Sequence, residues 1–426
     1  MWRLLRRLRY SLQRKRRSWG HHLDRLELFL SDVFYDRRHD RKARLLVLFL
    51  HPLSLLFGQI VRCRLWLYQR HCLSSATLGC PVIVVGNLTV GGTGKTPVTE
   101  YLARFLQAHG RRVAILSRGY KSRQESLFAR AWHWLSHQSP RGPKIVSDGR
   151  HLLLSAAEAG DEPRMLAQNL PGVCVLVDRN RVKAGQYAIR HLGADVLLLD
   201  DGLQYLPLKG HFYCTLWDKT QALEQHLLPR GILREPLEQL RRASCLLLSK
   251  SDGHCDEVLN RRLRAYNAQA PMLECCHRPK FFIRHADDHR ELLQWVEGKR
   301  IAILSGIARP ESFEQFLKEL GARILHHQRF SDHHLFSEDD LARFDRCVQL
   351  QAIDAILTTE KDSVRIRRDF PFCAPLHYLR IEIAILPNSQ TLEDVLFRFL
   401  PSLREHPSTE GKPRETGALS PKISAA

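Results

Sequence analysis

At 426 residues the chain is longer than one small module, and its composition, 44% hydrophobic and 26% charged, is globular, which excludes wholesale disorder. The formal net charge of +20 favours an anionic partner, such as nucleic acid, an acidic membrane surface or a phosphorylated substrate. The excess is concentrated in residues 1–44, which carry 14 Lys and Arg against 5 Asp and Glu. A basic arm on a moderately basic body favours an electrostatic anchor, so we expect no nucleic-acid partner.

The first apolar run, residues 45–61, is uncharged and ends before Arg62 and Arg64. It begins too late for a secretory signal, has the minimum length for a membrane span (roughly 17 residues) and contains Pro52, which would interrupt a helix. We therefore expect residues 1–70 to form a basic arm with a helical segment in the interface of an anionic membrane. A buried core helix with a solvated basic tail, and a transit peptide over residues 1–20, are the alternatives.

From Pro81 onward, short apolar runs alternate with helical stretches, a pattern that predicts an α/β fold with buried parallel strands and helices on both faces. The expected strands are Val82–Val85, Arg112–Leu116, Val173–Val177, Ala194–Leu199, Phe212–Trp217 and Cys245–Ser249, then Arg300–Leu304, Ala322–His326, Ala355–Thr358 and Leu376–Ile381. The expected helices include Thr96–Ala108, Gly160–Gln168, Arg179–His191, Glu311–Leu320 and Glu338–Leu350.

A boundary in residues 279–298 divides this pattern into two α/β series. We predict a first domain over residues 71–290, a second over 291–402 and a disordered tail over 403–426. Residues 122–144 are expected to form a loop or hairpin. The eleven cysteines are scattered without a CxxC pair, so we expect reduced, mostly buried thiols and no zinc-finger-type site.

Residues 82–97 read VIVVGNLTVGGTGKTP, an apolar strand, a Gly-rich loop and the start of a helix. This is the context of a phosphate loop, in which backbone N–H groups and the helix N-terminus bind phosphate oxygens. Lys95 would neutralise the β- and γ-phosphates of a nucleotide, and the Thr96 hydroxyl would bind Mg²⁺. The GxxxxGKT pattern has Gly where this chain has Thr89. The predicted nucleotide-binding residues are Thr89, Val90, Gly91, Gly92, Thr93, Gly94, Lys95 and Thr96.

Asp200 follows an apolar run in the segment DVLLLDDGLQ (195–204), so it emerges at the carboxyl edge of the sheet, where ligands bind in this architecture. Together with Asp201 it predicts a Mg²⁺ site, the alternative being a helix cap. The segment SKSD (249–252) loosely resembles the base-reading motif of GTPases. A P-loop GTPase that acts as a switch or metallochaperone is therefore the second hypothesis.

Further segments occur in the order of one known family. The segments are HPLSLLFG (51–58), VGNLTVGGTGKTP (85–97), LSRGYKS (116–122), VSDGRHLLLSAAEAGDEPRMLA (146–167), DRNRVKAG (178–185), LLDDGLQ (198–204), LPRGILREP (228–236), SGIARPESF (305–313), FSDHHLF (330–336) and TTEKDSVRI (358–366). On these segments the chain resembles the tetraacyldisaccharide 4′-kinases, the lipid A kinases of Gram-negative bacteria, over about residues 52–400. The Thr89 departure is itself characteristic of that family's loop.

The resemblance implies transfer of the γ-phosphate of ATP, with Mg²⁺, to the 4′-hydroxyl of tetraacyldisaccharide 1-phosphate in lipid A biosynthesis. It also implies two α/β/α domains with mainly parallel sheets that face each other across a cleft, the first resembling P-loop NTPases. The expected location is the cytoplasmic face of the bacterial inner membrane, peripheral or monotopic, on an anionic surface and with no obligate protein partner.

By the same resemblance Asp161, in GDEP, and His333, in SDHH, are the acid–base pair. From the residues alone Asp161 is a helix N-cap and His333 lies in a polar turn, where its neighbours Asp332 and His334 also allow a metal site. Because the phosphate loop and His333 belong to different domains, we expect domain closure on binding. Four arginines in matched segments are candidate contacts for substrate phosphates, although a solvated surface position is an equal alternative: Arg118, Arg179, Arg181 and Arg234.

Two positions depart from the family pattern. Tyr205 stands where the family usually has His, and QALEQH (221–226) replaces an Asn-containing segment. Both lie next to matched segments, so they affect details around the site and leave the expected reaction unchanged.

Overall fold

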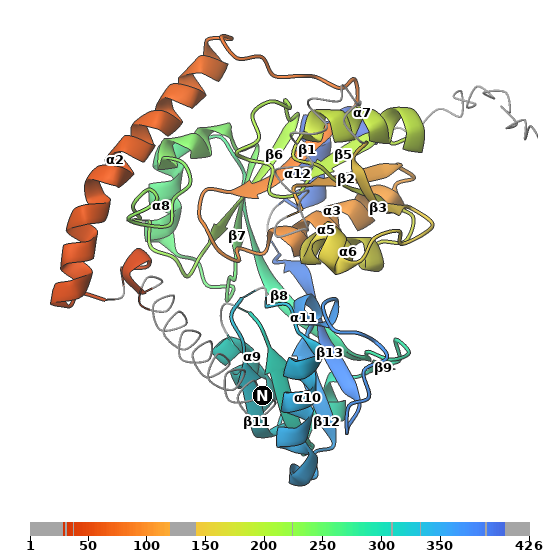
Figure 1. Ribbon diagram of the computed structural model, residues 1–426. Coiled ribbons are helices and arrows are strands. Elements are labelled where there is room, and N and C mark those ends of the chain that lie inside the picture. The colour runs from red at the N-terminus through yellow and green to blue at the C-terminus, as the bar shows by residue number, and fades with distance from the viewer. Residues whose placement is uncertain are drawn as a thin grey trace, which may run out of the picture.

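The computed structural model describes residues 29, 32–36, 38–119, 142–223, 225–307, 310–332, 334–387 and 390–404. Figure 1 shows two α/β halves, one above the other, connected by the long strands β8 and β13. Hydrogen-bonded neighbours run in the order β11-β10-β12-β13-β8-β7-β6-β1-β5-β2-β4-β3, with β9 beside β8, so one sheet continues through both halves.

The first half has parallel strands that are almost completely buried, which accounts for their continuous Val, Ile and Leu runs. Its strands are β1 (Val82–Asn87), β2 (Val113–Ser117), β3 (Lys144–Asp148), β4 (Cys174–Val177), β5 (Val196–Leu199), β6 (Phe212–Asp218) and β7 (Cys245–Ser249). Only β3 is antiparallel to its neighbour, at the edge. It lies at the end of the stretch expected to be a loop, of which residues 120–141 are outside the described residues.

Helices cover both faces of this sheet because alternate residues of each strand point to opposite sides. On one face Ile83 and Val85 of β1 pack with α3 (Lys95–Ala108) and α6 (Asp161–Asn169). On the other face Val82 and Val84 pack with α7 (Arg181–Leu192). The remaining helices here are α5 (Ala156–Ala159), α8 (Glu257–Tyr266) and the 3-10 helix η1 (Leu237–Arg242).

The second half repeats this arrangement. Its elements are η2 (Leu293–Val296), β10 (Arg300–Ser305), α9 (Pro310–Glu319), β11 (Arg323–Arg329), α10 (Glu338–Val348), η3 (Gln349–Gln351), β12 (Ala355–Thr359) and α11 (Glu360–Ser363). Ile301 and Ile303 of β10 pack against α9 on one face, and Ala302 and Leu304 pack against α10 on the other. The predicted α/β class and the ten expected strands are confirmed, with small shifts at their ends.

The junction between the halves differs from the expected linker. Strand β8 (Met272–Arg284) pairs in parallel with β7 through residues 272–274 and then antiparallel with β13 (Leu376–Ile385), and β9 (Arg290–Glu291) adds to its end. Because β8 changes its pairing strand along its length, its residues alternate between buried and less buried positions. It therefore carries no continuous apolar run. The C-terminal helix α12 (Leu392–Phe399), followed by η4 (Pro401–Leu403), lies within the range expected for the second domain but packs in the core of the first half.

One helix, α2 (Arg41–Gln69), replaces the expected broken segment, because Pro52 lies inside it without ending it. Within the described residues it is the helix long and apolar enough to cross a membrane. Its face toward the body carries Ser54 and Gly58, and Ser54 Oγ donates to Leu227 O at 2.7 Å. The opposite face exposes Leu45, Leu48, Phe49, Leu55, Leu56 and Ile60.

The cysteines differ from expectation in their burial. All eleven are free thiols, but five are exposed, two are half-buried and four are buried. The buried ones, Cys174, Cys214, Cys245 and Cys275, lie in strands, whereas exposed residues such as Cys63 and Cys347 lie on helices. Cys63 and Cys347 are exposed because they lie on amphipathic helices, whose outward faces the apolar-run argument did not consider.

Candidate active site

The phosphate loop connects the end of β1 to the start of α3 at the carboxyl edge of the sheet. Gly91 and Gly94 have φ angles of +111° and +86°, a backbone region that is readily available only to glycine. The buried Thr93 Oγ1 has no hydrogen-bond partner among the described residues. All eight predicted nucleotide-binding residues, 89–96, therefore lie in one loop at a helix N-terminus, a geometry suited to binding an anion.

Thr89, which stands where the GxxxxGKT pattern has Gly, fixes the base of this loop. Its side chain is buried, and its Oγ1 accepts a hydrogen bond from Asn87 Nδ2 at 3.1 Å. Thr89 also forms an antiparallel bridge with Leu233, while Val90 N donates to Ile232 O at 2.7 Å. The loop is thus attached to the segment after the cis Leu228–Pro229 bond, and no glycine is needed at this position.

Lys95 is held over the loop before any ligand binds. Its Nζ lies 3.3 Å from Asn87 Oδ1 and 3.7 Å from Asp201 Oδ1. Only 12% of the side chain is exposed. Asn87 was not predicted as a site residue, although its position as the last residue of β1, directly before the loop, is a usable signal.

Asp200 and Asp201 lie beside the loop because β5 is the parallel neighbour of β1, so that their carboxyl ends meet. Asp200 is buried, and its Oδ1 accepts from Thr99 Oγ1 at 3.1 Å. Burial raises the pKa of Asp200 well above its ordinary value, and the charges of Glu162 and Asp201 act in the same direction. A nearby divalent cation would favour the ionised carboxylate of Asp200 and so lower its pKa, which fits the predicted Mg²⁺ site.

Asp201 has a different electrostatic environment from that of Asp200. Burial acts to raise its pKa, but Lys95 and Arg234 outweigh burial and lower it. Arg234 Nη1 donates to both carboxylate oxygens of Asp201 at 2.9 Å. Of the four candidate substrate arginines, Arg234 is therefore already paired.

Arg181 is the buried member of the remaining three. Its guanidinium lies over the ring of Tyr205, 4.5 Å from the ring centroid, and its backbone N donates to Tyr205 Oη at 3.0 Å. The buried Nε has no hydrogen-bond partner among the described residues. Arg118 and Arg179 are exposed, Arg118 directly after β2 and Arg179 between β4 and α7.

Asp161 is the first residue of α6, and Gly160 with φ +97° occupies the N-cap position, so the expected N-cap role of Asp161 is wrong. The carboxylate is nearly buried, and its Oδ2 lies 3.4 Å from Nε of Arg365. Arg365 follows α11 in the second half and was not predicted, because nothing in the local sequence relates it to Asp161.

His333 lies outside the described residues. Its described neighbours lie against the start of α6: Asp332 Oδ1 is 3.4 Å from Lys361 Nζ, which is 4.0 Å from Glu162. His334 O accepts from Arg365 at 2.7 Å. Asp332 and His334 are thus connected to the start of α6 through Lys361 and Arg365.

A buried charged network joins the same elements behind the site. Arg380 of β13 bonds Glu100 of α3 and, at 2.6 Å, Glu360 of α11. Asn169 at the end of α6 donates to Glu100 at 3.2 Å and to Glu360 at 2.7 Å. The phosphate-loop helix, the Asp161 helix and the second half are thereby connected.

The segment SKSD does not present free side chains as a base-reading motif would. Lys250 pairs with the fully buried carboxylate of Asp218. Asp252 lies 3.7 Å from Lys219 Nζ, which also bonds Ser251 and Glu274. These contacts hold the ends of β6, β7 and β8 together and give the GTPase hypothesis no support.

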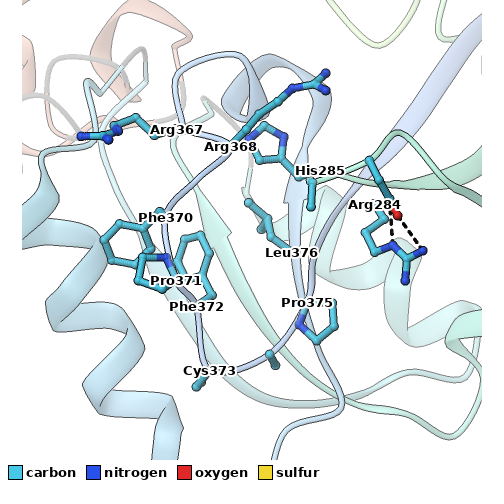
Figure 2. Close-up of a pocket in the computed structure, with 13 residues that line it drawn as sticks. Arg284, His285, Arg367, Arg368, Phe370, Pro371, Phe372, Cys373, Pro375 and Leu376 are labelled. Carbon is cyan, nitrogen blue, oxygen red and sulfur yellow. Dashed lines mark hydrogen bonds and ion pairs between the residues drawn. The ribbon is translucent and has the colours of Figure 1, made fainter.

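A separate groove of about 500 Å³ lies in the second half, at the amino end of β13. Figure 2 shows Phe370, Pro371 and Phe372 along one side of it and Arg284 on the opposite side. Its three arginines are neutralised: Arg284 by Asp287, Arg367 by Glu338 and Asp369, and Arg368 by Asp288. None of the predicted site residues lines it.

Comparison with known proteins agrees with this geometry. A family model described as tetraacyldisaccharide-1-P 4′-kinase matches residues 46–400. The tetraacyldisaccharide 4′-kinase of Anaeromyxobacter sp. (strain K) is 39% identical over 336 residues, covering 78% of this chain and 84% of that protein. The enzyme of that name from Syntrophus aciditrophicus (strain SB) is 34% identical over 361 residues, covering 82% and 92%. The crystal structure of LpxK from Aquifex aeolicus in complex with ATP superposes with a TM-score of 0.66 at 29% identity, covering 84% of this chain and all of that one. The chain therefore belongs to the tetraacyldisaccharide 4′-kinase family.

Proposed function

We propose that the protein is a Mg²⁺-dependent kinase that transfers the γ-phosphate of ATP to the 4′-hydroxyl of tetraacyldisaccharide 1-phosphate in lipid A biosynthesis. The observation that carries the proposal is the phosphate loop with Lys95 beside Asp200 and Asp201, in a chain that matches the kinase family from residue 46 to 400. The same match favours the kinase over a GTPase switch.

The phosphate edge, which consists of the phosphate loop with Lys95, Asp200 and Asp201, binds ATP, the phosphate donor. Backbone N–H groups of residues 91–95 and the N-terminus of α3 bind phosphate oxygens, and Lys95 neutralises charge on the β- and γ-phosphates. Thr96 and Asp200 are the residues that would hold Mg²⁺, with Asp201 beside them. When bound, Mg²⁺ neutralises the charge that develops on the phosphate oxygens.

Asp161 acts on the acceptor. Its carboxylate takes the proton of the 4′-hydroxyl as the new bond from that oxygen to the γ-phosphorus forms, and the bond from the γ-phosphorus to the β,γ-bridging oxygen breaks, which releases ADP. We propose His333 as its partner in the acid–base pair, as the resemblance of the SDHH segment to the family implies. The buried Arg181, with its unpartnered Nε, is the leading candidate for a substrate phosphate, and Arg118 and Arg179 are exposed at the same edge.

We place the protein on the cytoplasmic face of the inner membrane through α2. Ser54 and Arg64 of this helix donate to the backbone of the body, at Leu227 O and Gln204 O, so α2 lies along the body. A spanning orientation would draw the body into the bilayer, whereas a monotopic orientation inserts only the exposed apolar face. The basic arm would add attraction to anionic headgroups.

The test of the reaction is incubation with ATP, Mg²⁺ and purified tetraacyldisaccharide 1-phosphate, followed by mass spectrometry of the lipid. We expect a product one phosphate heavier, formed with ATP and absent without lipid. GTP-selective hydrolysis that ignores the lipid would favour the switch protein instead.

The test of the membrane assignment is flotation on anionic vesicles. Leu48→Glu with Phe49→Glu places charges on the exposed face of α2 and is expected to weaken vesicle binding strongly. Leu350→Glu changes a 95% exposed leucine in the second half and serves as the matched control. Equal flotation of both variants would contradict the monotopic assignment.

A further inference from the structure

Arg365 is the point at which the second half reaches the proposed base. Its side chain is completely buried, and its Nε lies 3.4 Å from Asp161 Oδ2. The two residues come from α6 and from the segment after α11, elements that lie at the junction of the halves (Figure 1). The carboxylate of one half is therefore paired with a cation of the other.

The guanidinium is fixed by contacts that do not involve Asp161. Its Nη1 donates to His334 O at 2.7 Å, its Nε to Lys361 O at 3.2 Å and its Nη2 to Gly306 O at 3.4 Å. Nη2 also donates to the fully buried Asp362 at 2.6 Å. These acceptors fix the planar guanidinium of Arg365 in one orientation. The guanidinium is therefore a rigid contact for the Asp161 carboxylate.

Asp362 is itself held on the side away from Asp161. Its Oδ2 accepts from Gly306 N at 3.1 Å and from Thr359 Oγ1 at 2.6 Å. The ring of Phe336 lies 5.7 Å from the guanidinium carbon and shields it from water. The arginine is thus part of a preformed unit of the second half, and Asp161 is its contact outside that unit.

Arg365 places a positive charge directly beside the Asp161 carboxylate, with Nε 3.4 Å from Oδ2. The other charged groups packed there are Glu162 on the same helix, Lys361 on α11, Asp332 beside it and Asp362 behind Arg365. A cation within about 4–6 Å favours the ionised carboxylate. A base must be ionised and correctly oriented before it can accept a proton.

We infer that Arg365 is a positioning residue of the kinase reaction: from the second half it orients the Asp161 carboxylate, so that the base is competent only when the two halves are packed together. This inference rests on the proposed role of Asp161. It assigns no contact between Arg365 and either substrate.

The test compares kcat and KM for wild type, Arg365→Gln and Arg365→Lys. In Arg365→Gln we expect kcat to fall by about 10²-fold, because a displaced base is inefficient. KM for ATP should stay unchanged. Arg365→Lys keeps the charge beside Asp161 and should restore part of the lost kcat.

Arg380→Gln is the matched control. Arg380 is another buried guanidinium that connects the halves, but it bonds Glu100 and Glu360 and not Asp161. It should lower stability and leave kcat within a few-fold of wild type. If kcat is unchanged in Arg365→Gln, or falls equally in Arg380→Gln, the inference is wrong.

Two further variants separate misfolding of Arg365→Gln from a wrong role for Arg365 or a wrong assignment of Asp161. If Arg365→Gln does not fold, Arg365→Gln combined with Asp362→Asn removes both charges of the buried pair and carries the same expectation. Asp161→Asn tests the underlying assignment: if it transfers phosphate at the wild-type rate, the proposed base is wrong. If Asp161→Asn is inactive and kcat of Arg365→Gln is unchanged, only the role of Arg365 is wrong.

Discussion

The two edges of the proposed active site, one for the phosphate donor and one for the acceptor, are built in different ways. The phosphate edge, with Lys95, Asp200 and Asp201, comes from adjacent parallel strands of one half. The acceptor edge at Asp161 requires both halves, since its carboxylate contacts Arg365 and its helix is tied to Glu360 through Asn169. The first edge exists wherever the first sheet folds, whereas the second exists only when the halves are packed against each other. Mutations at the two edges should therefore separate donor binding from acceptor chemistry and from stability.

Lys95→Ala should give the largest effect and tests the self-contained edge. Loss of a cation directed at the transferring phosphate is expected to lower turnover by about 10²–10³-fold or more. Stability should change little, because Asp201, the carboxylate beside Lys95, keeps its ion pair with Arg234. Turnover and thermal unfolding are measured together, with Lys280→Ala on β8 as the surface-lysine control. Turnover within a few-fold of wild type would remove the loop from the mechanism.

Arg380→Leu tests the edge that depends on both halves. It leaves Glu100 and Glu360 buried without their shared cation, which should lower the free energy of unfolding by about 3–5 kcal/mol. The comparison variant is Arg368→Leu, which breaks a half-exposed pair with Asp288 worth at most about 1 kcal/mol. Chemical denaturation measures both. Similar small losses would mean that the buried network does not hold the halves together.

His327→Gln tests how acid changes the stability of the second half, at a position away from both edges of the site. Burial lowers the pKa of His327, so the unfolded chain takes up a proton at higher pH than the folded one. The associated stability is present above about pH 6.5 and is lost as pH falls below it. We expect the variant to lose less stability than wild type between pH 7 and pH 5. An equal loss in both proteins would contradict this.

Tyr205→Phe should have the smallest effect and refines the phosphate edge. It removes the hydroxyl that accepts from Arg181 N but keeps the ring beneath the guanidinium. We expect about 1 kcal/mol or less in stability and less than a tenfold change in turnover. Tyr205→Ala, which also removes the ring, should raise KM for the lipid further. The hypothesis that the ring positions Arg181 fails if the two variants behave alike.

The sequence predicted the phosphate edge well because its information is local. A strand, a glycine-rich loop and a helix start are contiguous, and the apolar run before Asp200 identifies a second strand end. Parallel pairing then brings the two ends together. The contacts of Asn87 and Thr99 depend on side-chain directions, which local patterns do not specify.

The acceptor edge was predictable only through family resemblance. Asp161 reads as a helix start, and Arg365 lies far along the chain in a segment whose polar residues fit a surface turn equally well. Strand β8 was missed for a related reason: it changes from a parallel to an antiparallel partner, so its burial alternates. The continuity of α2 through Pro52 was also missed. A local rule treats a proline as a helix break, whereas Pro52 lies inside α2 without ending it.

The most direct measurement follows the γ-phosphate itself. Wild type and Asp161→Asn are each incubated with Mg²⁺, tetraacyldisaccharide 1-phosphate and ATP labelled at the γ-position, and nucleotide affinity is determined in parallel. We expect both proteins to bind ATP equally, with label reaching the lipid about 10²–10⁴-fold more slowly in Asp161→Asn. Label transfer at an undiminished rate in Asp161→Asn would contradict the account of a base held between the two halves.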